Sequence, residues 1–314
     1  MKKQLRDYLR LLRPRQWIKN FAVFAAITFS GQLFNEEIFN SVFIAFLIFC
    51  GISSAIYVIN DIFDIEKDKL HPFKRFRPLA AGDIPVKNAL VIAILLAAGS
   101  VIASFFLSTT FFAITLVYLV LQLSYSVLLK DIAVIDILAL AAGYILRVYA
   151  GEFASGYHIS VWLLLTTVSL SLFLAVGKRR SELTLIAHHT HASIAATRKS
   201  LSHYSERLLD VYASMFATST FIAYSLFTFL ENDRNLTTAN ELLLPQFLPD
   251  FLNRKWLMLT IIPVVYGLMR YLQDIYEKHE GESPEKVLIG DKPLLTNLII
   301  WISMVIFIIY VLGA

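Results

Sequence analysis

The stretch Asn60-Asp61-Ile62-Phe63-Asp64-Ile65-Glu66-Lys67-Asp68 directly follows an apolar run long enough to cross a bilayer. On an α-helix, Asn60, Asp61, Asp64 and Asp68 fall within roughly a quarter of the circumference. Three carboxylates and an amide this close together repel one another unless a positive group lies among them. We favour Mg²⁺ with these oxygens as ligands, because ionisable groups at membrane depth are usually functional. The alternative is a solvated acidic helix end.

The composition indicates a polytopic membrane protein, because 57% of the residues are hydrophobic and only 17% are charged. Apolar runs near the length of a spanning helix recur along the chain. We therefore expect an all-α fold with nine transmembrane helices in one helical membrane domain over 1–314. The predicted spans are 17–34, 39–59, 88–107, 111–129, 132–150, 160–177, 211–230, 255–272 and 295–313.

The basic residues predict the topology. If the N-terminus is cytoplasmic, every Lys and Arg falls on a cytoplasmic segment except Arg147, Arg234, Arg254 and Lys255. We therefore place the protein in a bacterial-type inner (plasma) membrane, with cytoplasmic loops at about 60–87, 178–210 and 273–294. The net charge of +4 then reflects topology and anionic lipid. No nucleic-acid-binding motif is present.

Residues 1–16 alternate leucines with basic residues, which predicts a short interfacial helix that stops at Pro14. We assign the basic residues of 2–19 to topology and lipid contact, with Lys19 and Asn20 as exceptions. The single cysteine, Cys50, lies within a span, so we expect a buried, inert thiol.

Three further features have weaker interpretations. For Arg147 we weigh a snorkelling side chain near the outer end of its span against a functional group in a deep cavity. The tract His188, His189 and His191 lacks further ligands, so a cytoplasmic loop is favoured over a metal site. The segment 231–254 is expected to lie on the outer surface.

Basic residues gather on the same predicted face as the acidic stretch. Arg75 and Arg77 follow it, Tyr125 and Lys130 close the fourth predicted span, and Lys178-Arg179-Arg180-Ser181-Glu182 opens the third cytoplasmic region. Carboxylates for a metal beside Arg and Lys are what a diphosphate substrate requires, because Arg binds phosphate oxygens in pairs and Lys adds a point charge. Topology alone is the alternative for each basic cluster.

The motif Asn60-Asp61-x-x-Asp64-x-x-x-Asp68, followed by Arg77-Pro78-Leu79-Ala80-Ala81-Gly82, resembles the first signature of the UbiA superfamily of intramembrane prenyltransferases. The resemblance covers essentially the whole chain. It implies nine helices around a central cavity open to the cytoplasm, and it allows a small homo-oligomer. Typical members carry a second aspartate-rich motif, but here the equivalent stretch is Lys178-Arg179-Arg180-x-Glu182.

With this basic stretch in place of the second aspartate-rich motif, the chain resembles one branch of the superfamily, the decaprenyl-phosphate phosphoribosyltransferases. Further features support the same resemblance: Arg13-Pro14-x-Gln16-Trp17-x-Lys19-Asn20, Tyr125-Ser126-x-x-Leu129-Lys130, Asp136, and Leu146-Arg147-x-x-x-Gly151. The resemblance implies transfer of 5-phosphoribosyl from phosphoribosyl diphosphate (PRPP) to a polyprenyl phosphate, with release of diphosphate and a role in cell wall biosynthesis. The lipid phosphate is mostly ionised at neutral pH and can attack without a strong base.

We therefore assign roles residue by residue. Asn60, Asp61, Asp64 and Asp68 hold Mg²⁺ on the PRPP diphosphate, and Lys19, Arg75 and Arg77 neutralise the leaving group. Lys130, Lys178, Arg179 and Arg180 hold the 5-phosphate or the lipid phosphate. Glu182 and Asp136 are candidates to stabilise the oxocarbenium-like carbon electrostatically. Asn20, Tyr57, Tyr125 and Arg147 are further candidate substrate contacts.

Two other functions stay open at this point. A conventional UbiA-type prenyltransferase would join a prenyl diphosphate to an aromatic or other acceptor, but it should show a second aspartate pair. A transporter or lipid-binding membrane protein should carry charge pairs near the bilayer midplane. The charges of this chain gather at one face instead.

Overall fold

The computed structural model describes residues 2–70, 74–189, 199–230, 255–277 and 284–312, and those residues form helices joined by turns, with no strand among them. They divide into two compact units. Unit 1 contains residues 1–27, 32–157 and 190–203, and unit 2 contains residues 28–31, 158–189 and 204–314. The prediction of a single domain over 1–314 stays a prediction.

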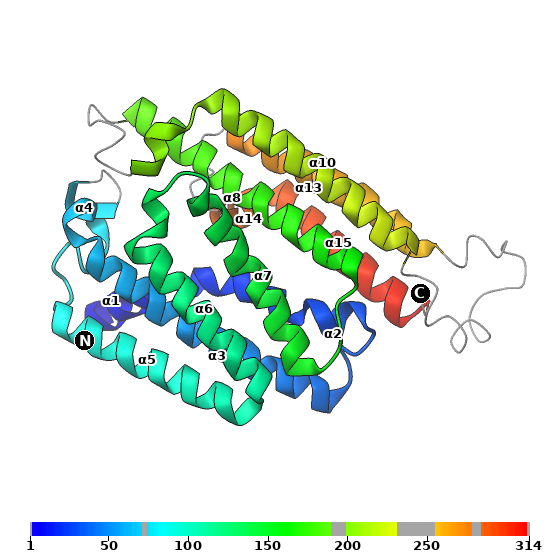
Figure 1. The fold of residues 1–314 in the computed structure, drawn as a ribbon, viewed down its shortest axis with the longest axis horizontal. Coiled ribbons are helices and arrows are strands. Elements are labelled where there is room, and N and C mark those ends of the chain that lie inside the picture. Colours follow the sequence, from blue (N-terminus) through cyan, green and yellow to red (C-terminus); the bar gives the residue numbers. More distant parts are fainter. Residues whose placement is uncertain (1, 71–73, 190–198, 231–254, 278–283, 313–314) are drawn as a thin grey trace, which may run out of the picture. The chain divides into compact units, whose positions relative to one another are not determined.

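Unit 1 is a bundle built around α3 (Glu36–Phe63), which packs against α5 (Val86–Leu107), α6 (Thr109–Val127) and α7 (Ile135–Ser155) (Figure 1). The N-terminal α1 (Lys2–Leu12) and the 3-10 helix η1 (Pro14–Phe24) also pack against α3. The short elements α4 (Ile65–Leu70), η2 (Lys74–Phe76) and η3 (Leu129–Asp131) cluster at one end of the bundle, and η4 (Lys199–His203) contacts η3.

Local sequence determines where the main helices of unit 1 begin. The Asn35 side chain caps α3 by accepting a hydrogen bond from the Ile38 backbone N–H (3.4 Å). Ser108 caps α6 in the same way through the Phe111 N–H (3.0 Å). At its other end, α3 stops at Asp64, and the chain restarts as α4. The prediction that Asn60, Asp61, Asp64 and Asp68 share one continuous helix is therefore wrong, because the helix breaks at Asp64.

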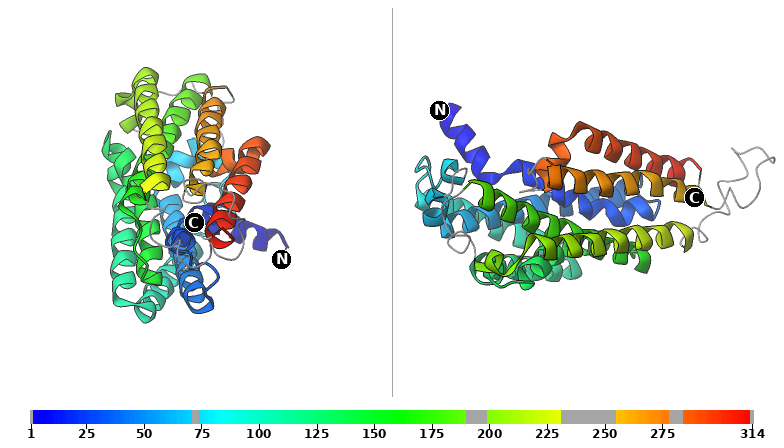
Figure 2. Two further views of the ribbon diagram at one scale, coloured as in Figure 1. Left: turned by 90° about the vertical axis from the view of Figure 1, so that its right-hand side faces the viewer. Right: turned by 90° about the horizontal axis from the view of Figure 1, so that it is seen from above.

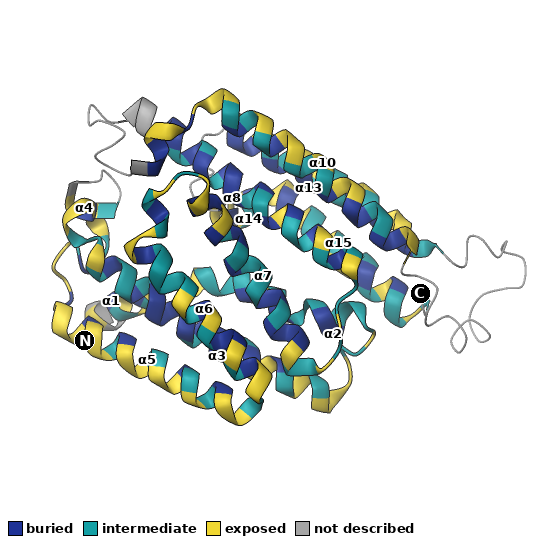
Figure 3. Ribbon diagram, viewed as in Figure 1, coloured by how far each residue is buried: buried dark blue, intermediate teal, exposed yellow. Residues whose placement is uncertain are grey.

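Burial separates the inner helix of unit 1 from its outer ones (Figure 3). In the most apolar window of α3, 61% of the residues are buried, against 17% for α5. Most of the exposed residues of α5 are large and apolar, among them Leu95, Phe105 and Phe106. A helix with an apolar exposed face is suited to lipid rather than to water.

Unit 2 consists of α8 (Val161–His189), α10 (Glu206–Leu230), η6 (Trp256–Thr260), α13 (Ile261–Glu277), α14 (Pro284–Gly290) and α15 (Lys292–Tyr310). In it, α8 packs along α10, and α13 packs against α15 (Figure 2). Asp291 caps α15 by accepting from the Leu294 N–H (3.0 Å), with Pro293 in the first turn, where its missing N–H costs nothing.

Eight helices among the described residues are long and apolar enough to cross a membrane. They match eight of the nine predicted spans, and the first predicted span, 17–34, differs. There the chain forms the 11-residue η1 and the 5-residue α2 (Ala25–Phe29). Because a 3-10 helix rises about 2.0 Å per residue and an α-helix about 1.5 Å, these elements would reach roughly 30 Å if collinear, near the thickness of a bilayer core.

The predicted cytoplasmic loops contain more helix than expected. Helix α8 runs on to His189, so Lys178 to Glu182 lie within a helix rather than at the start of a loop. The helix predicted within 1–16 is present as α1, which ends at Leu12 before Pro14, and its interfacial location stays a prediction. His191 and the segment 231–254 lie outside the described residues.

Candidate functional site

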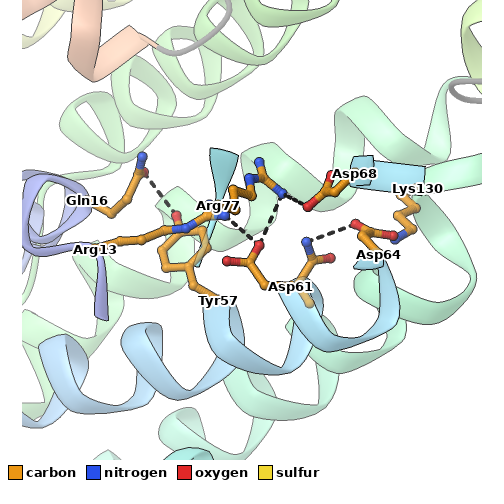
Figure 4. Close-up of polar contacts among 9 residues, drawn as sticks. Arg13, Gln16, Tyr57, Asp61, Asp64, Asp68, Arg77 and Lys130 are labelled. Carbon is orange, nitrogen blue, oxygen red and sulfur yellow. Dashed lines mark hydrogen bonds and ion pairs between the residues drawn. The ribbon is translucent and has the colours of Figure 1, made fainter. Parts of the chain in front are cut away.

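A cluster of ion pairs lies at the end of unit 1 where α3 and α6 end and α5 and α7 begin (Figure 4). Its centre is Asp61, whose side chain is 2% exposed. Asp61 Oδ1 accepts from Arg13 Nη2 at 2.5 Å and from Arg77 Nη1 at 3.1 Å. The two arginines come from either side of α3 in the sequence, so the carboxylate joins distant parts of the chain.

The other two carboxylates are also paired. Arg77 Nη1 donates to Asp68 Oδ2 at 2.6 Å, and Lys130 Nζ donates to Asp64 Oδ1 at 2.7 Å. The Asn60 amide donates to the second Asp64 oxygen at 3.0 Å. Burial raises the pKa of Asp68 above its usual value, and the charge of Arg77 opposes that rise.

Apolar packing holds the arginines over the carboxylates. Leu11 from α1 and Leu79 and Ile84 from the 77–84 segment are buried together against Val58 of α3. These contacts place the chain just before Arg13 and just after Arg77 on the same side of α3. Ser54 Oγ donates to the Leu12 carbonyl at 2.8 Å and fixes the end of α1.

This arrangement changes the interpretation of the acidic stretch. We expected a divalent cation to relieve carboxylate repulsion, but Arg13, Arg77 and Lys130 already neutralise the three carboxylates. Within the described ranges there is no group of three or more His, Cys, Asp or Glu residues placed to hold a metal. The donors are nonetheless of the type that Mg²⁺ prefers, since all are carboxylate or amide oxygens. The metal assignment to Asn60, Asp61, Asp64 and Asp68 stays a prediction.

Arg147 and Asn20 belong to a second, interior network of unit 1. Arg147 is 5% exposed, and it donates to Asn20 Oδ1 (2.8 Å), the Gly143 carbonyl (2.7 Å) and Tyr118 OH (2.5 Å). Asn20 also contacts Ser53. The snorkelling interpretation of Arg147 is therefore wrong, because its guanidinium is enclosed by polar partners. A substrate contact by Asn20 or Arg147 stays a prediction.

Glycines of α7 allow its neighbours η1 and α6 to pack closely against it. A Cβ on Gly151 would lie 1.8 Å from the Val23 carbonyl oxygen, so only glycine fits there. A Cβ on Gly143 would lie 2.5 Å from the Gln122 amide nitrogen. The Gly151 position in the motif Leu146-Arg147-x-x-x-Gly151 is thus explained by packing.

The remaining predicted residues of unit 1 have varied surroundings. The Tyr57 hydroxyl donates to Gln16 Oε1 at 3.1 Å, and its ring lies 5.2 Å from the Arg13 guanidinium. Asp136 is fully buried and accepts from Ser200 Oγ at 3.1 Å, which anchors η4. Its assigned role at the reacting carbon stays a prediction. Lys19 and Tyr125 are half-buried, whereas Arg75 is exposed. Arg75 lies over the Phe76 ring.

The basic stretch of unit 2 is engaged in ion pairs within that unit. Arg179 is fully buried and pairs with Glu182 on the next turn of α8. Arg180 donates to Asp210 (2.8 Å) and pairs with Glu206 (3.1 Å), which ties α8 to α10. Lys178 is half-buried. Phosphate binding by these residues stays a prediction, and Arg180 would have to exchange its carboxylate partners to achieve it.

Sequence reasoning missed Arg13 and Gln16 as site residues. We had assigned Arg13 to topology, but the structure pairs it with the most buried carboxylate of the cluster. The available signal was its place in the motif Arg13-Pro14-x-Gln16-Trp17-x-Lys19-Asn20, where a proline keeps Arg13 out of a continuous helix.

Comparison with known proteins identifies the family. Residues 21–289 match the family model described as the UbiA prenyltransferase family. The chain belongs to the UbiA prenyltransferase family. Together with the apolar helices, membership makes it an integral membrane protein.

Two relatives within the family are similar over almost their whole length. The decaprenyl-phosphate phosphoribosyltransferase of Mycolicibacterium smegmatis is 38% identical over 301 residues, covering 95% of this chain and 90% of the relative. The protein of the same name from Corynebacterium glutamicum is 36% identical over 309 residues, covering 97% and 87%.

Solved structures of the UbiA family share the fold. A UbiA homologue from Archaeoglobus fulgidus bound to geranyl diphosphate (GPP) and Mg²⁺ superposes with a TM-score of 0.68 at 19% identity, covering 98% of this chain and 100% of that one. The same protein bound to dimethylallyl diphosphate (DMAPP) and Mg²⁺ gives a TM-score of 0.67 at 18% identity, covering 96% and 99%. At these identities the likeness establishes the fold alone.

Proposed function

We propose that this protein transfers 5-phosphoribosyl from PRPP to a polyprenyl phosphate and releases diphosphate. The observation that carries the proposal is the cluster of three carboxylates and three cations at one end of unit 1. The relatives named decaprenyl-phosphate phosphoribosyltransferase support it at 38% and 36% identity.

The chemistry suits the residues of the cluster. A lipid phosphate oxygen attacks C1 of the ribose, the bond from C1 to the diphosphate oxygen breaks, and the diphosphate leaves with the electron pair. The lipid phosphate is already ionised at neutral pH, so the step needs no strong base. What the protein must supply is positive charge placed around the diphosphate.

A divalent cation, which we propose is Mg²⁺, would be held by Asp61, Asp64, Asp68 and Asn60 and would neutralise charge on the leaving diphosphate. Arg77 and Lys130 now pair with those carboxylates. On substrate binding these two cations exchange a carboxylate partner for a phosphate oxygen. The same cluster therefore keeps its charge balanced both with and without substrate.

We also propose that the cluster faces the cytoplasm of a bacterial-type inner membrane. The distribution of Lys and Arg supports this orientation, because the segments that join the spans at the cluster end carry most of the positive charge.

The first test is an Asp64→Asn variant assayed with labelled PRPP and a polyprenyl phosphate. Turnover should fall at least 100-fold, because Asp64 loses a charge that pairs with Lys130 and is available to a cation. Glu66→Gln is the matched control, since Glu66 lies on the exposed side of α4 and pairs only with Lys69 among the contacts described. Near-normal turnover of Asp64→Asn would rule out the assigned role.

Donor choice separates the proposal from conventional UbiA chemistry. Purified protein is incubated with PRPP or with geranyl diphosphate, each alone, with polyprenyl phosphate, or with an aromatic acceptor, and diphosphate release is measured. The proposal predicts release only from PRPP, and only when the lipid phosphate is present. Release from geranyl diphosphate with an aromatic acceptor would favour a prenyltransferase instead.

A further inference from the structure

The 3-10 helix η1 is unusually long, with 11 residues from Pro14 to Phe24. A 3-10 helix has three residues per turn, so side chains at i and i+3 eclipse, and runs beyond four residues are uncommon. η1 therefore aligns three rows of side chains, and two of them carry the polar contacts described above. The first of these two rows is Arg13, Gln16 and Lys19, and the second is Trp17, Asn20 and Val23. Arg13 flanks the first row at its N-terminal end and is counted with it because it contacts Asp61.

The second row anchors η1 inside unit 1. Trp17 Nε1 donates to Ser54 Oγ at 2.9 Å, and Asn20 accepts from Arg147 Nε at 2.8 Å. Val23 is fully buried, and its carbonyl lies against Gly151 of α7. These three contacts fix the rotation of η1 about its axis, and so they also fix the direction of the first row.

The first row begins at polar groups of α3. Arg13 pairs with Asp61 at 2.5 Å, and Gln16 accepts from the Tyr57 hydroxyl at 3.1 Å. Lys19 continues the row one turn further along η1. All three row residues are half-buried, whereas Arg15 of the same helix is exposed. Arg13 and Gln16 are drawn beside Tyr57 in Figure 4.

The backbone at Arg13 is strained. Its φ of 52° and ψ of 58° place a non-glycine residue in the left-handed region, directly before a proline. Such a conformation persists only where the surroundings determine it, and strained residues concentrate at functional sites. Here the surroundings are Asp61 and the Tyr57 ring.

We infer that Arg13, Gln16 and Lys19 form a phosphate-binding row, which presents two cations and an amide to a phosphate group of a substrate. Successive members lie about 6 Å apart along the helix axis, so the row reaches roughly 12 Å inward from the carboxylate cluster. This inference rests on the proposed function and extends it to Arg13 and Gln16. The phosphate belongs either to the sugar donor or to the lipid acceptor.

Binding measurements on three variants test the row. Arg13→Met and Lys19→Met remove one charge each while keeping an apolar side chain, and Arg15→Met removes a charge of the same helix outside the row. Calorimetric titration of the purified full chain with PRPP plus Mg²⁺, and separately with a short-chain polyprenyl phosphate, gives the dissociation constants. Arg13→Met and Lys19→Met should weaken binding of one of these ligands at least tenfold, and Arg15→Met should change both less than twofold. The ligand that is affected identifies the source of the phosphate.

The row is disproved if Lys19→Met binds both ligands within twofold of the parent protein, or if Arg15→Met weakens binding as much as Lys19→Met does. Should Arg13→Met lower the apparent melting temperature too far for titration, Arg13→Lys takes its place, and Lys19→Met still decides. Failure of the parent protein to bind either ligand would instead count against the proposed function. In that case, titration of the same variants with inorganic diphosphate tests the row alone, with the same criterion.

Discussion

At the scale of single residues, Asp61 shows how the site is kept neutral. Its carboxylate is almost fully buried, and isolated charges are costly to bury. Two arginines from outside α3 pair with it, so any ligand that takes one of them must offer Asp61 a replacement. A divalent cation that binds together with a diphosphate would meet that requirement, because the cation would pair with the carboxylate while the diphosphate pairs with the arginine.

Gly151 gives a prediction about stability. A Gly151→Ala variant should lose about 2 kcal/mol or more, because the new Cβ would overlap the Val23 carbonyl, which is backbone and cannot rotate away. The apparent melting temperature of the purified protein in detergent measures the effect. Gly99→Ala is the matched control: no atom lies within 4 Å of its added Cβ, and alanine favours a helix interior, so its melting temperature should not fall. Equal melting temperatures for the two variants would contradict the packing described.

The polar residues of the acidic stretch were predictable from sequence, whereas their partners were only partly so. Spacing and an apolar neighbourhood were enough to single out Asp61, Asp64 and Asp68. Arg13 was missed because the positive-inside pattern already explained every basic residue before Lys19. Nothing in the sequence showed which of those residues turns away from lipid to meet a carboxylate.

At the scale of elements, η1 and the break in α3 are the features that sequence reasoning did not predict. Hydrophobic periodicity distinguishes a helix from a strand, but an almost uniformly apolar segment does not distinguish a 3-10 helix from an α-helix. Likewise, no glycine or proline marks the end of α3 at Asp64. Tertiary contacts determine both features. The contacts of Trp17 and Asn20 hold η1 in its 3-10 conformation, and the ion pairs around Asp64 determine where α3 ends.

Arg147 gives the prediction at this scale. An Arg147→Met variant should lower the apparent melting temperature by several degrees, because Asn20 and Tyr118 would each lose a buried hydrogen-bond partner and η1 would lose an anchor. Arg147→Lys should recover only part of the loss, since an ammonium cannot reproduce the planar guanidinium geometry. The exposed Arg15→Met variant controls for loss of charge alone. An unchanged melting temperature in Arg147→Met would show that the network contributes little.

At the scale of the whole molecule, membership of the family and the all-helical architecture agree with what hydropathy and charge predicted. The number of spans is approximate, since eight long helices accompany the short elements η1 and α2. The relation between the carboxylate cluster of unit 1 and the basic stretch of α8 in unit 2 stays a prediction. Sequence motifs indicate which segments bind the same substrate, but they do not give the distance between those segments.

The single cysteine makes the topology straightforward to measure. Cys50 is buried and unpaired, so a membrane-impermeant maleimide should leave the parent protein unlabelled. Lys87 is exposed at the cluster end of unit 1, and Glu36 is exposed at the start of α3, at the opposite end. A Lys87→Cys variant should be labelled in inverted membrane vesicles, and a Glu36→Cys variant in right-side-out spheroplasts. The reverse pattern would overturn the proposed orientation.

The enclosure of α3 by its neighbours also determines which helices of unit 1 unfold locally first. Amide protons exchange with deuterium only when a segment transiently breaks its backbone hydrogen bonds, and inner helices break them last. The amides of α3 that precede Asp61 should therefore be among the slowest to exchange in unit 1, while those of α1 exchange early. Local unfolding of α1 would then expose the carboxylate cluster to water while α3 stays folded.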